Sequence, residues 1–76
     1  MGRVLTINLE NTPWPASILK YNEHLGKMRS GDRLVATVED TDIIGNLEII
    51  LKHTPALTYT ITGNDRKFRI VAVKKE

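Results

Sequence analysis

No cysteine occurs in this chain of 76 residues. Its absence excludes disulfides, thiolate ligands for a metal ion and a cysteine nucleophile. Aromatic residues form only 5% of the chain, so few side chains are available to stack on nucleic acid bases. The longest apolar runs are a few residues long, too short to cross a membrane as a helix. We therefore expect a small folded domain without thiol chemistry, cofactor, metal site or membrane association.

The composition is that of a globular domain. Apolar residues account for 41% of the chain and charged residues for 26%, which differs from the low hydrophobicity and high charge of disordered chains. We expect one domain over residues 1–76, and a domain of this size buries only about 60% of the surface of its unfolded chain. The first residues lack the charged and then apolar pattern of a signal peptide, so a cytoplasmic location is expected.

Charge is unevenly distributed along the sequence. The net charge of +2 is too small to indicate a polyanionic partner by itself. The C-terminal quarter is nevertheless basic and offers a candidate basic patch, formed by Arg66, Lys67, Arg69, Lys74 and Lys75. Binding of RNA through this patch is one hypothesis, although the shortage of stacking residues makes nucleic acid an unexpected partner.

Periodic apolar residues predict four strands and two helices. Alternation with a period of two predicts strands over residues 4–9, 58–62 and 68–72, and a mostly apolar segment predicts a short buried strand over 34–38. Gly63-Asn64-Asp65 predicts the turn of a hairpin between the last two strands. Spacings of three and four predict two amphipathic helices, with stripes of Trp14, Ile18, Tyr21, Leu25 and Met28 in the first and Ile43, Ile44, Leu47, Ile50 and Leu51 in the second.

Proline, glycine and capping residues mark the ends of the two predicted helices. Pro15 suits the first turn of a helix, where its missing N–H has no intrahelical partner. Gly31 can adopt the left-handed conformation that ends the first helix. Thr41 or Asp42 can cap the second helix with a side-chain oxygen.

The order strand, helix, strand, helix, strand, strand predicts an α/β (α+β) two-layer sandwich. Right-handed crossovers place both helices on one face of a four-stranded mixed sheet. The opposite face is expected to carry residues that alternate with the core positions, namely Thr58, Thr60, Thr62, Arg69 and Val71. This semi-polar surface either stays solvated or meets a partner.

Two prolines separated by one residue make Thr12-Pro13-Trp14-Pro15 the most distinctive segment of the chain. They restrict the backbone just before the first predicted helix. We expect Thr12 to cap that helix, because its hydroxyl can accept hydrogen bonds from the free N–H groups of the first turn. For Trp14 two interpretations stay open: it packs on Ile18 as the start of the apolar stripe, or it points outward as a docking residue.

This arrangement resembles the TusA or SirA-like sulfur-carrier family. Members have a first strand, a Cys-Pro-x-Pro motif opening the first helix, a Gly-acid pair before the second strand, acidic residues after it and a Phe-x-Ile closing strand. The corresponding residues here are Thr12-Pro13-Trp14-Pro15, Gly31-Asp32, Glu39-Asp40 and Phe68-Arg69-Ile70. Thr12 replaces the persulfide-bearing Cys of the family, and the family's Asp and Gly ahead of the motif have no clear counterparts in residues 6–11.

The resemblance implies a sulfur-carrier-like fold without the sulfur chemistry, because a threonine hydroxyl cannot hold a persulfide. We therefore expect a non-catalytic binding or accessory protein. It would dock through Thr12, Pro13, Trp14 and Pro15 onto a protein partner, such as a sulfurtransferase or a larger enzyme. Two alternatives stay open: participation in sulfur transfer or tRNA thiolation without carrying sulfur, and RNA binding through the basic C-terminal hairpin.

Overall fold

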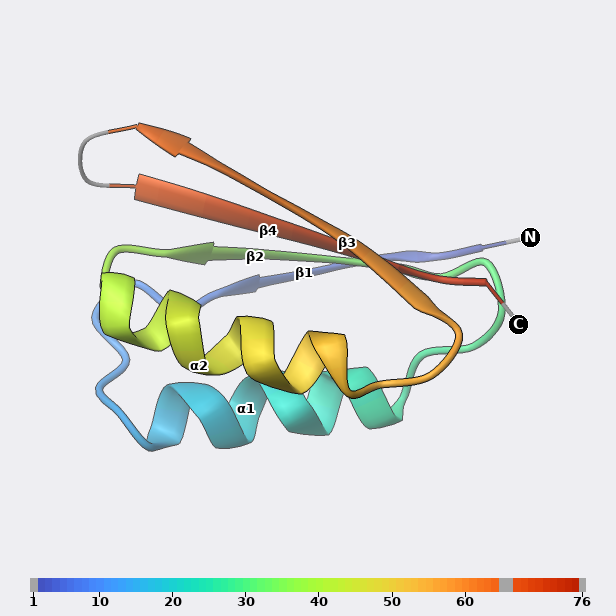
Figure 1. The fold of residues 1–76 in the computed structure, drawn as a ribbon, viewed down its shortest axis with the longest axis horizontal. Helices are drawn as coiled ribbons and strands as arrows, with labels where there is room; N and C mark the ends of the chain where they lie inside the picture. Colours follow the sequence, from blue (N-terminus) through green and yellow to red (C-terminus); the bar gives the residue numbers. More distant parts are fainter. Residues whose placement is uncertain (1, 65–66, 76) are drawn as a thin grey trace.

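The computed structural model describes residues 2–64 and 67–75. Along the chain the elements are β1 (Val4–Asn8), α1 (Ala16–Gly26), β2 (Arg33–Val38), α2 (Thr41–Lys52), β3 (Leu57–Asn64) and β4 (Lys67–Lys74) (Figure 1). This order confirms the predicted succession of strands and helices. Neither of the described helices has the length and apolar character needed to cross a membrane.

The four strands form one mixed sheet in the order β1-β2-β4-β3. β1 and β2 are parallel, and the pairings of β2 with β4 and of β4 with β3 are antiparallel. Figure 1 shows α1 and α2 on one face of this sheet. The predicted two-layer α+β sandwich with a four-stranded mixed sheet is therefore confirmed.

Alternation along the strands divides the sheet into a covered face beneath the helices and an open face. On β2, Leu34, Ala36 and Val38 are buried on the covered face, whereas Val35 and Thr37 point the other way. The core between the layers consists of Ile7, Leu9, Tyr21, Leu25, Met28, Leu34, Ala36, Val38, Ile43, Leu47, Leu51, Ile70 and Ala72. The open face consists of Val4, Thr6, Asn8, Arg33, Val35, Thr37, Thr58, Thr60, Thr62, Lys67, Arg69, Val71 and Val73. All five residues predicted for this face lie on it.

The first helix ends earlier than the sequence predicts. α1 stops at Gly26, and its C-cap is Lys27. Gly31 has a positive φ of 87° as expected, but it lies in the loop that follows, where its N–H donates to the Lys74 carbonyl oxygen over 2.8 Å. The left-handed conformation of Gly31 therefore lets the loop return to the sheet and does not end the helix.

The second helix follows its predicted apolar stripe. Ile43, Leu47 and Leu51 are buried against the sheet. The N-cap is Asp40, which keeps an extended backbone and accepts a hydrogen bond of 2.8 Å from the Asp42 N–H. The cap thus precedes the two predicted capping residues, because an N-cap residue lies just outside the helical turn that it closes.

The β3–β4 hairpin has longer strands than the sequence predicts. Gly63 and Asn64 belong to β3 and pair with Phe68 and Lys67, although the sequence places them in the turn. Asp65, the third residue of that predicted turn, lies outside the described residues. A Cβ at Gly63 would lie 2.5 Å from the Phe68 ring and 2.8 Å from the Lys67 carbonyl oxygen. Close packing, not turn geometry, therefore requires glycine at this position.

Candidate functional site

The Thr12–Pro15 segment connects β1 to α1 at the end of the molecule where both helices begin (Figure 1). The Thr12 N–H donates to the Leu9 carbonyl oxygen over 3.1 Å. Pro15 is the N-cap of α1, and none of the described side chains caps this helix. The prediction that Thr12 is the cap is therefore wrong, because the rest of the segment separates its hydroxyl from the first turn at Ala16.

Trp14, which is joined to Pro15 by a cis peptide bond, is exposed at this end of the molecule. It keeps 62% of its surface accessible to solvent. The interpretation of Trp14 as the start of the α1 stripe is therefore wrong, because Trp14 precedes the helix, which begins at Ala16. Ile18 is the first stripe residue that packs against the core. Trp14 thus offers solvent an apolar ring and an indole N–H donor.

An acidic hollow of about 430 Å³ adjoins this segment. Its lining consists of Leu9, Asn11, Thr12, Pro13, Glu39, Asp40 and Ile43. Glu39 and Asp40 contribute the carboxylates, and one oxygen of Asp40 is engaged by the N-terminus of α2. The Thr12 hydroxyl therefore shares the hollow with carboxylates and not with a histidine or lysine base. Such a hollow suits a cation or a hydrogen-bond donor from a partner.

The basic residues of the C-terminal quarter do not form the single patch that the sequence predicts. Lys67 and Arg69 lie on the open face near one end of β4. Lys74 lies about 17 Å further along the strand at about 3.3 Å per residue, and its Nζ donates to the Met28 carbonyl oxygen over 3.3 Å. Lys75 follows at the same distant end, and Arg66 lies outside the described residues. Of the described members of the predicted patch, Lys67 and Arg69 lie on one face, whereas strand alternation places Lys74 on the covered face at the far end of the strand.

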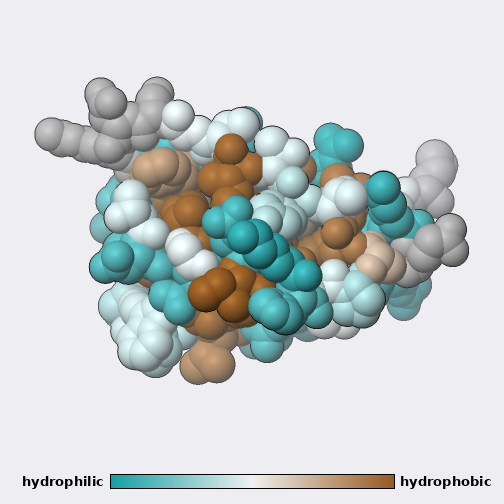
Figure 2. All heavy atoms as spheres, in the orientation of Figure 1, coloured by the Kyte–Doolittle hydropathy of each residue, from teal (hydrophilic) through white to brown (hydrophobic). Residues whose placement is uncertain are grey.

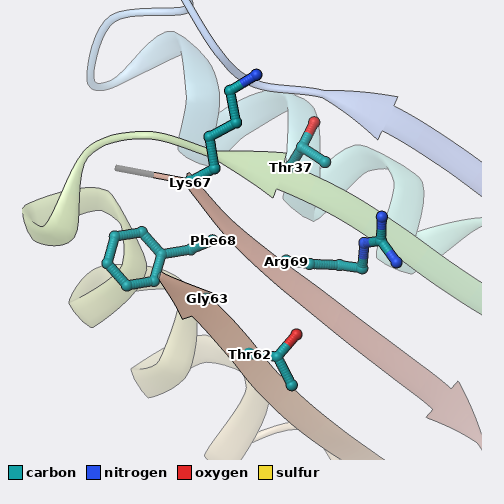
Figure 3. A pocket seen from close by; sticks show the side chains of 6 residues that line it. All are labelled: Thr37, Thr62, Gly63, Lys67, Phe68 and Arg69. Carbon is teal, nitrogen blue, oxygen red and sulfur yellow. The ribbon is translucent and has the colours of Figure 1, made fainter. Parts of the chain in front are cut away.

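A second hollow of about 430 Å³ opens on the open face. Figure 3 shows the side chains of Thr37, Thr62, Lys67 and Arg69 around it, together with Gly63 and Phe68. Thr37, Arg69 and Thr62 form one row across β2, β4 and β3. Two cations and two hydroxyls therefore line one shallow surface, although the Lys67 amine extends toward Glu10, 4.0 Å away. Arg69 and the two hydroxyls suit a carboxylate or phosphate oxygen.

Arg33 is the open-face cation that sequence reasoning missed. It begins β2 and pairs with Val73, four residues along β4 from Arg69. The predicted strand over 34–38 starts one residue too late to include it. Extending the alternation of Val35 and Thr37 by one step would have placed Arg33 on the same face.

The Gly31-Asp32 pair of the family resemblance lies at the opposite end of the sheet from the Thr12–Pro15 segment. The Asp32 carboxylate is buried and accepts hydrogen bonds from the Arg3 N–H (2.9 Å), the Arg29 N–H (2.9 Å) and the Arg3 guanidinium (3.0 Å). These hydrogen bonds hold the pKa of Asp32 well below its usual range, because they stabilise the ionised carboxylate. The largest contribution comes from the Arg3 N–H, followed by the Arg29 N–H and the Arg3 guanidinium. Asp32 therefore joins β1 to the loop before β2, and it contributes nothing to either hollow.

Two buried hydroxyls on α1 are also absent from the sequence predictions. Ser17 and Tyr21 are fully buried one turn apart, and neither hydroxyl has a hydrogen-bond partner among the described residues. Burial raises the pKa of the Tyr21 hydroxyl above its usual range. Both side chains face the core, and neither lines the acidic hollow or the open-face hollow.

Isolated apolar side chains on the surface do not mark a docking surface. Val4, Leu19 and Ile49 are exposed, but they come from three different elements and line neither hollow. In the space-filling view the apolar side chains over the helices are separated by hydrophilic ones (Figure 2). Scattered apolar residues of this kind are normal on soluble domains. Among the large exposed apolar residues of the described chain, Trp14 is the one that directly follows a residue lining a hollow, namely Pro13.

Comparisons of the chain with protein-family models, with curated proteins and with solved structures found no match. Among residues 2–64 and 67–75, no three histidine or acidic side chains converge as metal ligands would. Trp14, the acidic hollow and the open face are the features of the described residues that bear on function.

Proposed function

We propose that this chain is a non-catalytic, cytoplasmic binding protein with a sulfur-carrier-like fold, and that it docks onto a protein partner through the Thr12–Pro15 segment. The observation that carries the proposal is Trp14, which is exposed between two prolines and directly follows Pro13, a residue that lines the acidic hollow. Tryptophan is among the residues most often found at the energetic centre of protein interfaces. Prolines on both sides limit the backbone freedom that binding would remove, which favours association.

The chemistry around Thr12 supports binding and not catalysis. A threonine hydroxyl needs an adjacent base to become a nucleophile, and the hollow that it lines holds Glu39 and Asp40 and no histidine. The same carboxylates indicate what a partner presents: an apolar socket for the indole ring and an Arg or Lys that reaches into the acidic hollow. A sulfurtransferase or a larger enzyme with such a surface is the proposed partner class.

The division of the basic residues weighs against the RNA-binding alternative. Lys67 and Arg69 are separated from Lys74 and Lys75 by most of the length of β4. Among the described residues, Phe68 is the one aromatic residue at the open-face hollow, and its strand position belongs to the covered face, so the open face offers no series of aromatic rings for stacking. Participation in sulfur transfer without carrying sulfur stays a prediction, because it would use the same docking segment.

Replacement of Trp14 tests the proposal. The natural protein, Trp14→Ala and Leu19→Ala are used to capture partners from the source cells, and the affinity for the captured, purified partner is then measured by titration. Leu19 is a matched control because it is as exposed as Trp14, at 66% against 62%. We expect Trp14→Ala to weaken binding by about thirtyfold, as for an interface hot spot, and Leu19→Ala to leave it unchanged. Equal affinity for all three proteins would contradict docking through this segment.

A further inference from the structure

The open face carries only cationic charges among its described residues. These cations are Arg33, Lys67 and Arg69, and the remaining residues of the face are valines, threonines and Asn8. Val35, Val71 and Val73 occupy the two central strands, between Arg33 on one side and Arg69 on the other. Lys67 has Glu10 within 4.0 Å, whereas no described acid pairs with Arg33 or Arg69. The face therefore has an apolar centre with a cation at each end.

These features restrict what can cover the open face. A second copy placed face to face would bring the same cations together, which opposes association. Nucleic acid would find no series of aromatic side chains for its bases, because the described open-face strand positions hold none and Phe68 alone lines the hollow from a covered-face position. The short side chains of valine and threonine cannot reach into a lipid bilayer as interfacial anchors do. A complementary partner has an apolar stripe flanked by carboxylates.

We propose that the open face binds an acidic amphipathic helix of a partner protein, in a contact separate from the docking of Trp14. Arg33 and Arg69 lie about 14 Å apart, at about 3.3 Å per residue along β4 and 4.8 Å between strands. That distance corresponds to about nine residues of helix at 1.5 Å per residue. The partner helix therefore has two acidic residues about nine positions apart, and its apolar stripe covers Val35, Val71 and Val73. One of its carboxylates enters the hollow beside Arg69, Thr37 and Thr62.

The size of the face indicates a transient contact. Four strands at about 4.8 Å spacing and three rows of outward side chains span about 400 Å². A stable interface buries about 800 Å² on each partner. We therefore expect dissociation constants in the range of tens to hundreds of micromolar, with a strong dependence on salt.

Two matched peptides test this proposal on the full chain. Both are 18-residue helix-forming peptides with the same leucine stripe, and the flanking positions are glutamate in one and lysine in the other. Binding is followed by backbone amide NMR shifts. We expect the glutamate peptide to shift amides of β2 and β4 next to the open face, and the lysine peptide to bind at least tenfold more weakly.

Charge reversal separates a specific site from general attraction. The double variant Arg33→Glu/Arg69→Glu should bind the glutamate peptide at least tenfold more weakly than the natural protein does, and it should bind the lysine peptide more tightly. Lys20→Glu/Lys52→Glu makes the same change in net charge on exposed helix positions and should alter neither affinity by more than twofold. Circular dichroism confirms that each variant is folded.

Several results would overturn the proposal. One is a dissociation constant of the glutamate peptide above about 1 mM. Another is an equal loss of affinity for that peptide in the two double variants. A third is a set of amide NMR shifts confined to the helices. Tighter binding of a mixed RNA oligomer or of anionic phospholipid vesicles to the same residues would assign the face to a different partner class. Loss of the Trp14-dependent contact alone would leave the peptide results unaffected, so the two proposals fail separately.

Discussion

The two faces of the sheet use alternate residues of the same strands for different purposes. On β2 and β4, Leu34, Ala36, Ile70 and Ala72 are fully buried beneath the helices. Val35 and Val71 come from the same strands and are also apolar, yet they remain partly accessible on the open face. The difference shows that apolar character alone does not define the core of a small domain. Whether another layer covers an apolar side chain decides how much its truncation lowers the free energy of unfolding.

Leu47→Ala should have the largest effect, because it removes a fully buried side chain that packs on the covered face. We expect a loss of about 2–5 kcal/mol in the free energy of unfolding, from lost burial and a residual cavity. That is a large share of the roughly 4–11 kcal/mol expected for a domain of this size. Urea unfolding measures it. A loss below about 1 kcal/mol would show that α2 does not pack on the sheet as described.

Asp32→Asn should have a smaller effect that depends on pH. Asp32 lies in the loop just before β2, and the hydrogen bonds that its carboxylate accepts from Arg3 and Arg29 favour the ionised form. Because its pKa is lowered in the folded state, its stabilising contribution is complete above about pH 5, where the unfolded-state carboxyl is ionised, and is lost as the pH falls toward the folded-state pKa. The natural protein should therefore lose stability between about pH 5 and 2 more steeply than the variant.

Urea midpoints of both proteins, measured across this pH range, check the prediction for Asp32. The Asp42→Asn variant is the control, because the Asp42 side chain is exposed and has no such set of donors. Parallel pH profiles for the natural protein and Asp32→Asn would contradict the assigned role of the Asp32 carboxylate.

Val71→Ala should have the smallest effect, although Val71 lies at the centre of the sheet. The open face leaves its side chain partly solvated, so we expect a loss of no more than about 1 kcal/mol, mainly from reduced strand propensity. The measurement is the same urea titration as for Leu47→Ala. A loss equal to that of Leu47→Ala would mean that a second molecule covers the open face in solution.

Most of the fold could be predicted from local sequence patterns. Strand alternation identified Thr58, Thr60, Thr62 and Val71 as open-face residues, and the helical spacing identified the buried stripe of α2. These predictions are confirmed because the side-chain period of a strand or helix depends only on neighbouring residues. The element order then left few arrangements of a two-layer sandwich.

The candidate site was less predictable, because its residues are related through the fold and not through spacing. Thr12 has the chemistry of a helix cap, but the start of α1 at Ala16 leaves its hydroxyl outside the first turn. Trp14 matches the apolar stripe by spacing and is exposed because it precedes the helix. Arg33 was missed because its strand begins one residue earlier than predicted.

The sequence by itself determined the order of the elements, the period of each and the absence of thiol chemistry, since all three depend on residue types and local spacing. Only the tertiary structure decided which charges meet. Strand register places Arg33 and Arg69 four residues apart along neighbouring strands of one face, with Lys74 on the other face. The close approach of β1 to the loop before β2 gives Asp32 its partners from Arg3 and Arg29. Charges separated along the chain interact only at short range, so their pairing follows from the packed fold and not from their order in the sequence.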